Sequence, residues 1–502
     1  MIRVDVGARR ERTFARLDST AFDALVVGGG IVGTGIARDL TLRGLRVALV
    51  EQRDLASGTS SRPTRLIHGG LRYLEILDFG LVRTDMRERE VLLRLAPHLV
   101  QPLPFLTPMY DRGVLYRAKL QAGMQLYDAL SYDKSLPTRQ WLNRRQVLRA
   151  EPGLNASDLQ GAWQFYDGQV SLVERLVIEN ALDAAGEGAV IATHAPATGF
   201  LRDPAGAVVG ARVRDTLGHR EVDVRARLTI NATGPWLDLT SASLRSGARP
   251  LLRLTKGVHL VTPAATRHAH VLFAPRDGRL FFVIPWLGYS LVGTTDTDYQ
   301  GDPARASATQ EDIEYLLDQA HHFFPSAPFQ HILYTYAGVR ALVRVAAVKE
   351  GKVSRKHALH DHGRRDGVAG IVSVVGGKIT GYRAIAEEVG RLVARRLGQV
   401  EDRGSITQQR PLPGGKLANL EDYVELSVWP RAQRLGLGRD QARHLGCVYG
   451  SLAPEVLALA EQDPRLTQRV CASQPSIAAE LARAVADEWA VSIGDVLLRR
   501  TP

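Results

Sequence analysis

The chain has 502 residues, of which 45% are hydrophobic and 23% are charged, and its formal net charge at pH 7 is +11. This length predicts two or three folded domains, and the composition excludes a disordered chain. The positive charge favours anionic partners, but it is spread along the chain without basic runs between aromatic residues, which argues against nucleic acid as a partner.

Residues 1–20 are polar and rich in arginine, without the apolar stretch of a secretory signal, so we expect a basic tail. The two cysteines, Cys447 and Cys471, have neither disulfide nor zinc spacing and indicate a reducing compartment. No apolar window reaches the roughly 20 residues of a membrane-spanning helix. A contact with a membrane would therefore be made at its surface.

The segment 23–54 predicts a dinucleotide site and reads DALVVGGGIVGTGIARDLTLRGLRVALVEQRD. Residues 24–27 are a short apolar run, typical of a buried parallel strand. Gly28, Gly30 and Gly33 follow as G-x-G-x-x-G. In this motif the first glycine permits a tight turn, the second lets the backbone approach a pyrophosphate, and the third lets the helix pack on the strand.

A helix is expected from Ile31 to Arg43, with its N-terminal amides facing the phosphates. Residues 46–51 read as the next strand, and Glu51 ends it about 20 residues after the glycines. An acid at this position accepts hydrogen bonds from a ribose diol. Because strand, glycine turn, helix, strand and acid occur in order, the segment indicates a dinucleotide rather than an ordinary strand-to-helix turn.

The next segments predict a second body beside the nucleotide-binding layer. A polar loop over 57–75 precedes a helix over 81–100, whose charges we expect to form a solvated face. The apolar side of this helix carries Val82, Met86, Val91, Leu92 and Leu95. Strand-like segments dominate from about 250 to 335 and predict a mainly antiparallel sheet that could roof a cofactor. The final hundred or so residues read as mainly helical.

The segment SVVGGKITGYR at 373–383 helps to decide whether the cofactor is a nicotinamide or a flavin. A flavin ring must itself be held, so a second glycine turn before a long helix favours FAD over NAD. Gly376 and Gly377 let the backbone approach the ring, and Lys378 with the helix N-terminus would stabilise the charge of a reduced flavin. The alternative is a simple strand-to-helix turn with an exposed lysine.

Oxidation of a secondary alcohol needs a group that takes the hydroxyl proton while a hydride leaves the carbon. His259 in KGVHL, close to Lys256 in the sheet expected to cover the flavin, is the first candidate. A structural histidine is the alternative interpretation. The HALHDH segment offers His357, His360 and His362, but no other ligand-rich sequence accompanies it, so no metal site is predicted.

Several motifs, in one order, resemble the FAD-dependent glycerol-3-phosphate dehydrogenases. They are GGGIVGTGIARD, GTSSRPTRLIHGGLRYLE, REREVLLRLAPHLV, NATGPW, KGVHLV, VIPWLGYSLVGTTDTDYQGDP, TYAGVRAL and VVGGKITGYR. The resemblance implies an α/β fold with a Rossmann-like FAD-binding domain, a mainly antiparallel β-sheet substrate cap domain and a C-terminal helical domain. It also implies oxidation of sn-glycerol 3-phosphate to dihydroxyacetone phosphate, with hydride transfer to flavin N5 and electrons passed to a membrane quinone.

The expected domains are discontinuous along the chain. The FAD-binding domain comprises 21–102, 166–250 and 336–402. The cap comprises 103–165 and 251–335, and the C-terminal helical domain comprises 405–502.

The resemblance also assigns site residues. The expected catalytic residues are His259, Arg340 and Lys378. The expected substrate-binding residues are Arg72, Tyr73, His259, Arg340, Arg355, Lys378 and Thr380. The expected FAD-binding residues are Gly28, Gly30, Gly33, Glu51, Thr59, Ser60, Ser61, Arg65, His68, Gly69, Thr233, Gly234, Gly377 and Lys378.

Departures from the family pattern leave the exact polyol phosphate open. They are Val32 for a frequent asparagine, Leu172 and Val173 for a pair of acids, and Ala341 for a proline. The alternatives are an oxidase that passes electrons to oxygen, a dehydrogenase of another polyol phosphate, and a nonenzymatic nucleotide-binding protein. The resemblance and the positive charge imply a cytoplasmic location, peripheral to the inner face of the cell membrane and its anionic lipids; a homodimer is left open.

Overall fold

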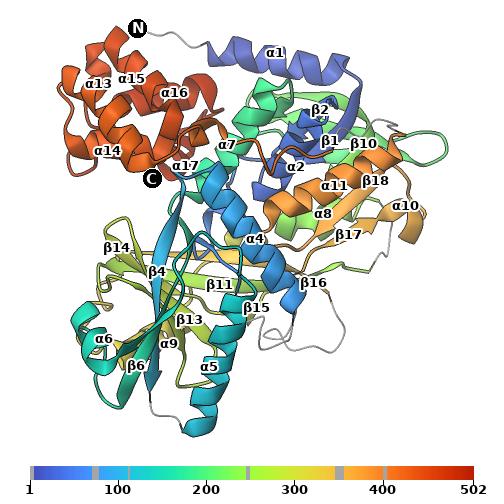
Figure 1. Cartoon of the computed structure of the whole chain (residues 1–502). Coiled ribbons are helices and arrows are strands. Elements are labelled where there is room, and N and C mark those ends of the chain that lie inside the picture. The colour runs from blue at the N-terminus through green and yellow to red at the C-terminus, as the bar shows by residue number, and fades with distance from the viewer. Residues whose placement is uncertain are drawn as a thin grey trace.

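The computed structural model describes residues 5–70, 78–110, 113–244, 249–344, 356–398 and 404–501. Figure 1 shows three bodies: a sheet flanked by helices, a second sheet that carries long strands, and a group of helices formed by the last hundred residues. The chain passes between the first two bodies several times, so each sheet contains segments that lie far apart in the sequence.

The first sheet has a parallel centre, as the buried apolar run at its start predicts. Its central strands are β18, β10, β1, β2 and β7 in spatial order, and all are parallel. Their bounds are β18 Ile371–Val375, β10 Arg220–Asn231, β1 Phe22–Val27, β2 Val47–Val50 and β7 Val190–Ala192. Antiparallel strands extend it: β17 (Ala358–Asp361), β9 (Val208–Asp215) and β8 (Ala197–Arg202).

Three helices cover one face of this sheet. They are α2 (Ile31–Leu42), α7 (Val173–Gly186) and α11 (Tyr382–Arg396), and α2 packs between the other two. Their apolar side chains and those of the strands share one core. Because a parallel sheet must be buried on both faces, the other face also needs a cover.

The N-terminal segment supplies part of that cover, so the expectation of a basic tail is wrong. Helix α1 (Val6–Ser19) buries Phe14 and Leu17 in a core with residues of β1, β2, β9 and β10. Arg10 donates to Asp215 at 2.7 Å and to two backbone carbonyls. The two apolar residues are three positions apart and so share a helix face, but the surrounding arginines mask this signal in the composition.

The second sheet has ten strands and is antiparallel except where β12 pairs with β4. In spatial order its main strands are β15 Thr297–Asp298, β11 Leu252–Pro263, β14 Tyr289–Gly293, β13 Leu280–Trp286, β12 Ala269–Phe273, β4 Val100–Tyr110, β6 Leu159–Val170 and β3 Leu66–Ile67. Strand β16 (Tyr334–Val343) pairs with β11, and β5 (Gln140–Asn143) pairs with β6.

Adjacent residues of this sheet face different cores, because side chains alternate along a strand. Phe105 and Leu106 illustrate this. Leu106 lies in a core with α9 (Gln310–Phe323) and α6 (Arg144–Ala150), whereas Phe105 lies in a core with α4 (Phe79–Leu95) and α5 (Val114–Ala129).

The C-terminal helices enclose a core of their own. They are α12 Leu420–Tyr423, α13 Trp429–Arg434, α14 Arg439–Tyr449, α15 Ala453–Gln462, α16 Ala478–Asp487 and α17 Ile493–Arg499. Buried ion pairs join this body to the first, among them Arg175 of α7 with Glu488 at 2.7 Å. Over the part of the chain that is described, we find no helix with the length and apolarity needed to span a bilayer.

Candidate functional site

A cavity of about 310 Å³ opens between the two sheets, at the carboxyl ends of the parallel strands. It is lined by the residues that follow these strands: Gly28 after β1, Glu51 after β2, Thr233 after β10 and Gly377 after β18. In open α/β sheets this edge, where strands on either side are connected in opposite directions, is where ligands bind. The volume is within the range of small-molecule and cofactor sites.

The glycine turn after β1 has the tight geometry that the sequence predicts. Gly28 has φ +115°, and a Cβ there would lie 2.6 Å from the carbonyl oxygen of Ala232. Gly33 does not line the cavity; a Cβ on Gly33 would lie 1.9 Å from the Gly28 carbonyl oxygen, so only glycine lets α2 pack this closely on the turn.

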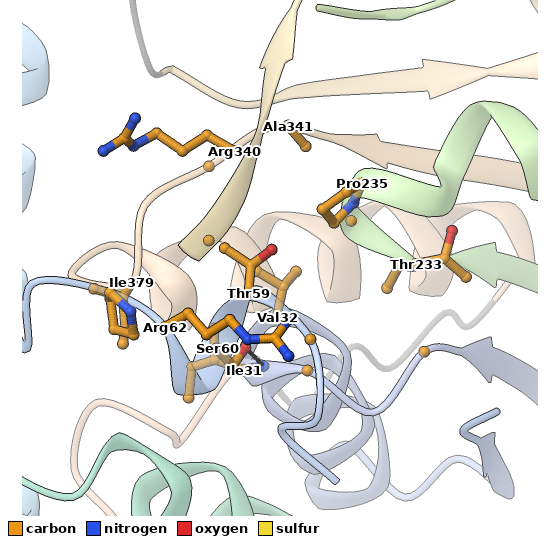
Figure 2. A pocket seen from close by; sticks show the side chains of 18 of the residues that line it. Ile31, Val32, Thr59, Ser60, Arg62, Thr233, Pro235, Arg340, Ala341 and Ile379 are labelled. Carbon is orange, nitrogen blue, oxygen red and sulfur yellow. Dashed lines mark hydrogen bonds between the residues drawn. The ribbon is translucent and has the colours of Figure 1, made fainter. Parts of the chain in front are cut away.

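The N-terminus of α2 faces this cavity with few partners of its own. Gly30 is the N-cap and offers no capping side chain, while the Ile31 amide donates to Ser60 Oγ at 3.0 Å. Figure 2 shows this hydrogen bond at the start of α2. Unsatisfied amides at a helix N-terminus, together with the helix dipole, form an anion site, so this wall fits the pyrophosphate of a dinucleotide.

Glu51 is held in place by two backbone amides. Its Oε2 accepts from the Gly29 amide at 2.6 Å and its Oε1 from the Arg53 amide at 2.9 Å. Burial raises the pKa of this carboxyl, while the amides of Arg53 and Gly29 lower it. Each carboxylate oxygen still has acceptor capacity, so a ribose hydroxyl can bind here.

The second sheet contributes His259 from β11, and its environment keeps it neutral. The side chain is 2% exposed, stacks on Tyr336 at 4.8 Å between ring centroids, and places Nε2 3.0 Å from Thr64 Oγ1. Burial, then Arg340 and Arg65, lower the pKa of His259 to about 3. Its Nδ1 has no hydrogen-bond partner in the structure as described.

Arg340 of β16 lies close to this histidine and is fixed by acceptors from the segment that follows β14. Its Nη1 donates to Asp296 Oδ1 at 3.0 Å, and its Nη2 donates to Thr294 Oγ1 at 2.8 Å. Gly257 of β11 makes room for it, since a Cβ there would lie 2.1 Å from Arg340 Nη2. Figure 2 shows Arg340 and Ala341 on β16, with Thr233 and Pro235 of the segment after β10.

The turn after β18 supplies a second cation. Lys378 Nζ donates to Asp85, a buried carboxylate of α4. Burial raises the pKa of Asp85, and Lys378 opposes that rise. Thr380 Oγ1 accepts from the His68 amide at 3.2 Å, so residues 378–380 and 68 form one connected wall.

Some charged residues of α4 are buried, which the sequence did not lead us to expect. We expected these charges on a solvated face; Arg87 and Arg94 are indeed exposed, but Asp85, Glu88 and Arg89 are each at most 3% exposed. Arg383 of α11 donates to both oxygens of Glu88, and Arg89 donates to Asp167 of β6. Asp85 lies between Val82 and Met86 on the apolar side of the helix, and an acid in such a position is the available sequence signal for a buried ion pair.

Sequence reasoning did not identify three further residues of the site: Asp85, Asp296 and Arg62. Arg62 lines the cavity (Figure 2), and burial lowers the pKa of its guanidinium. No hydrogen bond or ion pair to its side chain occurs among the residues that the structure describes. It follows Ser60 and Ser61 closely, but an arginine in a polar loop gives no signal of its own.

The structure brings together most of the predicted site residues. Those that line the cavity are Gly28, Gly30, Glu51, Thr59, Ser60, His68, Thr233, Gly234, His259, Arg340, Gly377, Lys378 and Thr380. Arg72, Tyr73 and Arg355 lie outside the described residues.

Ser61, Arg65 and Gly69, like Gly33, do not line the cavity. Arg65 donates to both oxygens of Glu174, and its guanidinium lies 4.5 Å from the centre of the Trp286 ring. Ser61 Oγ donates to the Gly58 carbonyl, and the Gly69 amide donates to Tyr127 Oη. These contacts give all three a role in shaping the wall behind the cavity.

The histidines of HALHDH lie away from the cavity. His360 Nε2 and His362 Nδ1 contact Asp366 Oδ2 at 2.8 and 2.6 Å, and the three ligand atoms lie within 4.8 Å of one another. His362 Nε2 is 2.8 Å from Ser373 Oγ, and His357 pairs with Glu388 instead. Hydrogen bonds therefore account for the cluster, and the absence of a metal site stays a prediction.

Comparisons with protein families and with known proteins find matches over nearly the whole chain. Residues 23–392 match the model of the FAD-dependent oxidoreductases, and residues 405–502 match the C-terminal domain of alpha-glycerophosphate oxidase. A glycerol-3-phosphate dehydrogenase of a Synechocystis strain is 39% identical over 98% of this chain and 90% of that protein. An aerobic glycerol-3-phosphate dehydrogenase of Staphylococcus haemolyticus is 34% identical over 98% of this chain and 88% of that protein.

One solved structure matches this chain over nearly its whole length. The glycerol-3-phosphate dehydrogenase of Bacillus halodurans, complexed with FAD, superposes with a TM-score of 0.79 at 30% identity, over 98% of this chain and 88% of that one. An L-alpha-glycerophosphate oxidase of Mycoplasma pneumoniae with FAD bound has a TM-score of 0.58 at 20% identity, over 76% of this chain and 95% of that one, and shows a shared fold.

Proposed function

The chain belongs to the family of FAD-dependent glycerol-3-phosphate dehydrogenases, and we propose that it oxidises sn-glycerol 3-phosphate to dihydroxyacetone phosphate. One observation carries the choice of substrate: a neutral, buried histidine lies in the same cavity as Arg340 and Lys378. Such an arrangement suits an alcohol that also bears a dianion. FAD, when bound, accepts the hydride that leaves the substrate carbon.

The cofactor would be held mainly by backbone groups. Gly28, Gly30 and Ser60 would surround the pyrophosphate, and Glu51 would accept the ribose hydroxyls. The expected residues Thr59, Thr233, Gly234, Gly377 and Lys378 line the remaining wall. Support for this assignment comes from the cavity lining, which contains all of these residues.

His259 lines the cavity, and its imidazole would hold the substrate hydroxyl and take its proton. A pKa of about 3 is low for a general base, whose best value lies near the working pH. The two negative charges of a bound phosphate raise the pKa of a nearby imidazole, because they favour its protonated form. Substrate binding therefore prepares the base.

The substrate phosphate would be bound by Arg340, and the alcohol end oriented by Lys378 and Thr380. Asp296 fixes the Arg340 guanidinium before the substrate arrives, which lowers the entropy lost on binding. The resemblance adds Arg72, Tyr73 and Arg355 to this set. Arginine suits the task because its planar fork donates two hydrogen bonds to phosphate oxygens.

We further propose that electrons pass to a membrane quinone, at a peripheral site on the inner face of the cell membrane. The net charge of +11 favours contact with anionic lipids. Oxygen is the competing acceptor, and the match of residues 405–502 to a domain of alpha-glycerophosphate oxidase favours that second candidate.

Anaerobic mixing of the purified flavoprotein with sn-glycerol 3-phosphate tests the substrate. We expect loss of the visible flavin absorbance, with glycerol and other polyol phosphates reacting far more slowly. Equal bleaching by glycerol would contradict a phosphate-binding site. The reduced protein is then mixed with either a soluble quinone or oxygen, and the faster reoxidation identifies the acceptor. Stoichiometric hydrogen peroxide would favour the oxidase.

A further inference from the structure

Arg499 and Arg500, at the end of α17, bind the turn that follows β2 in the first body. Asp54 belongs to the turn that follows β2, and its carboxylate is fully buried. Arg500, also fully buried, donates from Nη2 to Asp54 Oδ1 at 2.9 Å and from Nη1 to Oδ2. Arg499 Nε donates to the same Oδ2. The buried carboxylate of Asp54 thus accepts hydrogen bonds from two arginines that lie more than 440 positions away in the sequence.

The same turn presents Glu51 to the cavity. Besides its side-chain bonds to the amides of Gly29 and Arg53, the turn is tied to the glycine segment by the Ala56 amide, which donates to the Gly29 carbonyl at 3.0 Å. Asp54 lies three residues after Glu51 and does not line the cavity. Its carboxylate therefore faces the C-terminal body while that of Glu51 faces the ligand.

A second attachment holds the other side of the turn. Asp495 of α17 lies 3.1 Å from His194 Nε2, and the His194 amide donates to the Arg53 carbonyl at 2.6 Å. The next amide, of Ala195, donates to the Glu51 carbonyl at 2.8 Å. Helix α17 is thus connected to the backbone of the turn through Asp54 and also through His194.

We propose that Arg500 is a positioning residue for the cofactor: through Asp54 it fixes the turn that places Glu51 against the adenosine ribose of FAD. The inference rests on the ribose role proposed above for Glu51. Removing Arg500 leaves a buried carboxylate with fewer donors, so the turn must open to hydrate it. The C-terminal body then acts on cofactor affinity without touching the cavity.

The test compares FAD with FMN, which lacks the adenosine. Apoprotein is prepared from the full chain, and the dissociation constant of each flavin is measured by fluorescence titration. For Arg500→Met we expect about tenfold weaker FAD binding, equivalent to about 1.4 kcal/mol, and unchanged FMN binding. Equal losses for both flavins, or unchanged FAD binding, would overturn the proposal.

Arg175→Met is the matched control. Arg175 is a fully buried arginine at the same interface, paired with Glu488 of the C-terminal body, and it does not line the cavity. We expect this variant to lower the melting temperature and to keep the preference for FAD over FMN. If it loses that preference as Arg500→Met does, general loosening of the interface explains the effect and the proposal fails.

Two further measurements keep the proposal testable if Arg500→Met does not fold. Asp54→Asn with Arg500→Met removes the buried carboxylate together with Arg500, while Arg499 keeps its hydrogen bond to Asp495, so we expect a folded protein that still binds FAD weakly. In the unaltered protein, FAD binding should slow hydrogen exchange in α17, because coupling between two sites is reciprocal. Unchanged exchange in α17 would overturn the proposal.

Glu51→Gln separates this inference from its premise. If Glu51→Gln leaves the FAD preference intact, the ribose role is wrong and the inference falls with it. If Glu51→Gln removes the preference while Arg500→Met retains it, only the inference is overturned. Neither result depends on turnover of glycerol 3-phosphate.

Discussion

The two ends of the cavity are built on different principles. At the end formed by Gly28–Gly33 and Glu51, the groups that face the ligand are mostly backbone amides and a carboxylate held by amides. At the end formed by His259, Arg340 and Lys378, they are side chains from three separate elements, and acids from two more segments hold the cations. Local chain geometry therefore makes the first end, whereas long-range charge pairing makes the second.

The largest expected effect is at the second end. Lys378→Met leaves Asp85 buried without its cation, so we expect a loss of about 3–5 kcal/mol in stability and at least about a hundredfold slower flavin reduction. Thermal unfolding and anaerobic stopped-flow measure the two effects. Adding Asp85→Asn should restore stability but not the reduction rate, and the exposed Lys416→Met should change neither. Normal reduction by Lys378→Met would remove Lys378 from the catalytic set.

At the first end of the cavity, a change in backbone packing alone should lower stability and weaken FAD binding. Gly33→Ala introduces a Cβ 1.9 Å from the Gly28 carbonyl oxygen, so α2 must move off the turn. We expect about 1–3 kcal/mol lower stability and weaker FAD binding, measured by unfolding and by flavin titration. Gly186→Ala, at the end of α7 with open space around it, serves as control and should stay within about 1 kcal/mol. Undiminished FAD binding by Gly33→Ala would contradict the close-packing argument.

The low pKa of His259 predicts how the unfolding free energy of the protein changes with pH. In the unfolded chain its imidazole protonates below about pH 6.5, whereas in the folded protein it stays neutral down to about pH 3. Between these values the unfolded state binds the extra proton, so stability falls as pH decreases, by about 1 kcal/mol for each pH unit. His259→Gln should show a smaller fall, measured as the difference in unfolding free energy from the parent. Parallel curves would show that His259 is protonated when folded.

Replacing Arg62 should have the smallest effect, and it distinguishes a contact with FAD from a contact with the substrate phosphate. It lines the cavity without an acid paired to it in the described segments, so a ligand anion is its available partner. For Arg62→Gln we expect FAD affinity to fall by about 1 kcal/mol, with the KM for glycerol 3-phosphate unchanged. The exposed Arg87→Gln is the control. A raised KM with normal FAD affinity would instead assign Arg62 to the substrate phosphate.

The contrast between the ends also explains what the sequence could predict. The strand, helix and acid around Gly28 lie within about thirty residues, so their spacing alone predicts their geometry. The same holds for the strand and turn before Lys378. The partners of the second end could not be predicted: Asp85 meets Lys378 only because α4 packs beside the turn after β18, and Asp296 meets Arg340 only because β14 and β16 both pair with β11. Burial of the charges on α4 and of Phe14 in α1 left only weak local signals, namely an acid on an apolar helix side and two apolar residues among arginines, because their partners come from distant segments.

The largest wholly buried side chains among the described residues are arginines: Arg38, Arg89, Arg175 and Arg500. Two of these join the first body to the C-terminal helical body, Arg175 to Glu488 and Arg500 to Asp54. Without the C-terminal helices, Asp54 would lose its hydrogen bonds from Arg499 and Arg500, and Arg175 would lose its bond to Glu488. The nucleotide-binding layer therefore relies on the C-terminal helices to neutralise a buried carboxylate, so docking of those helices is a condition for its complete folding.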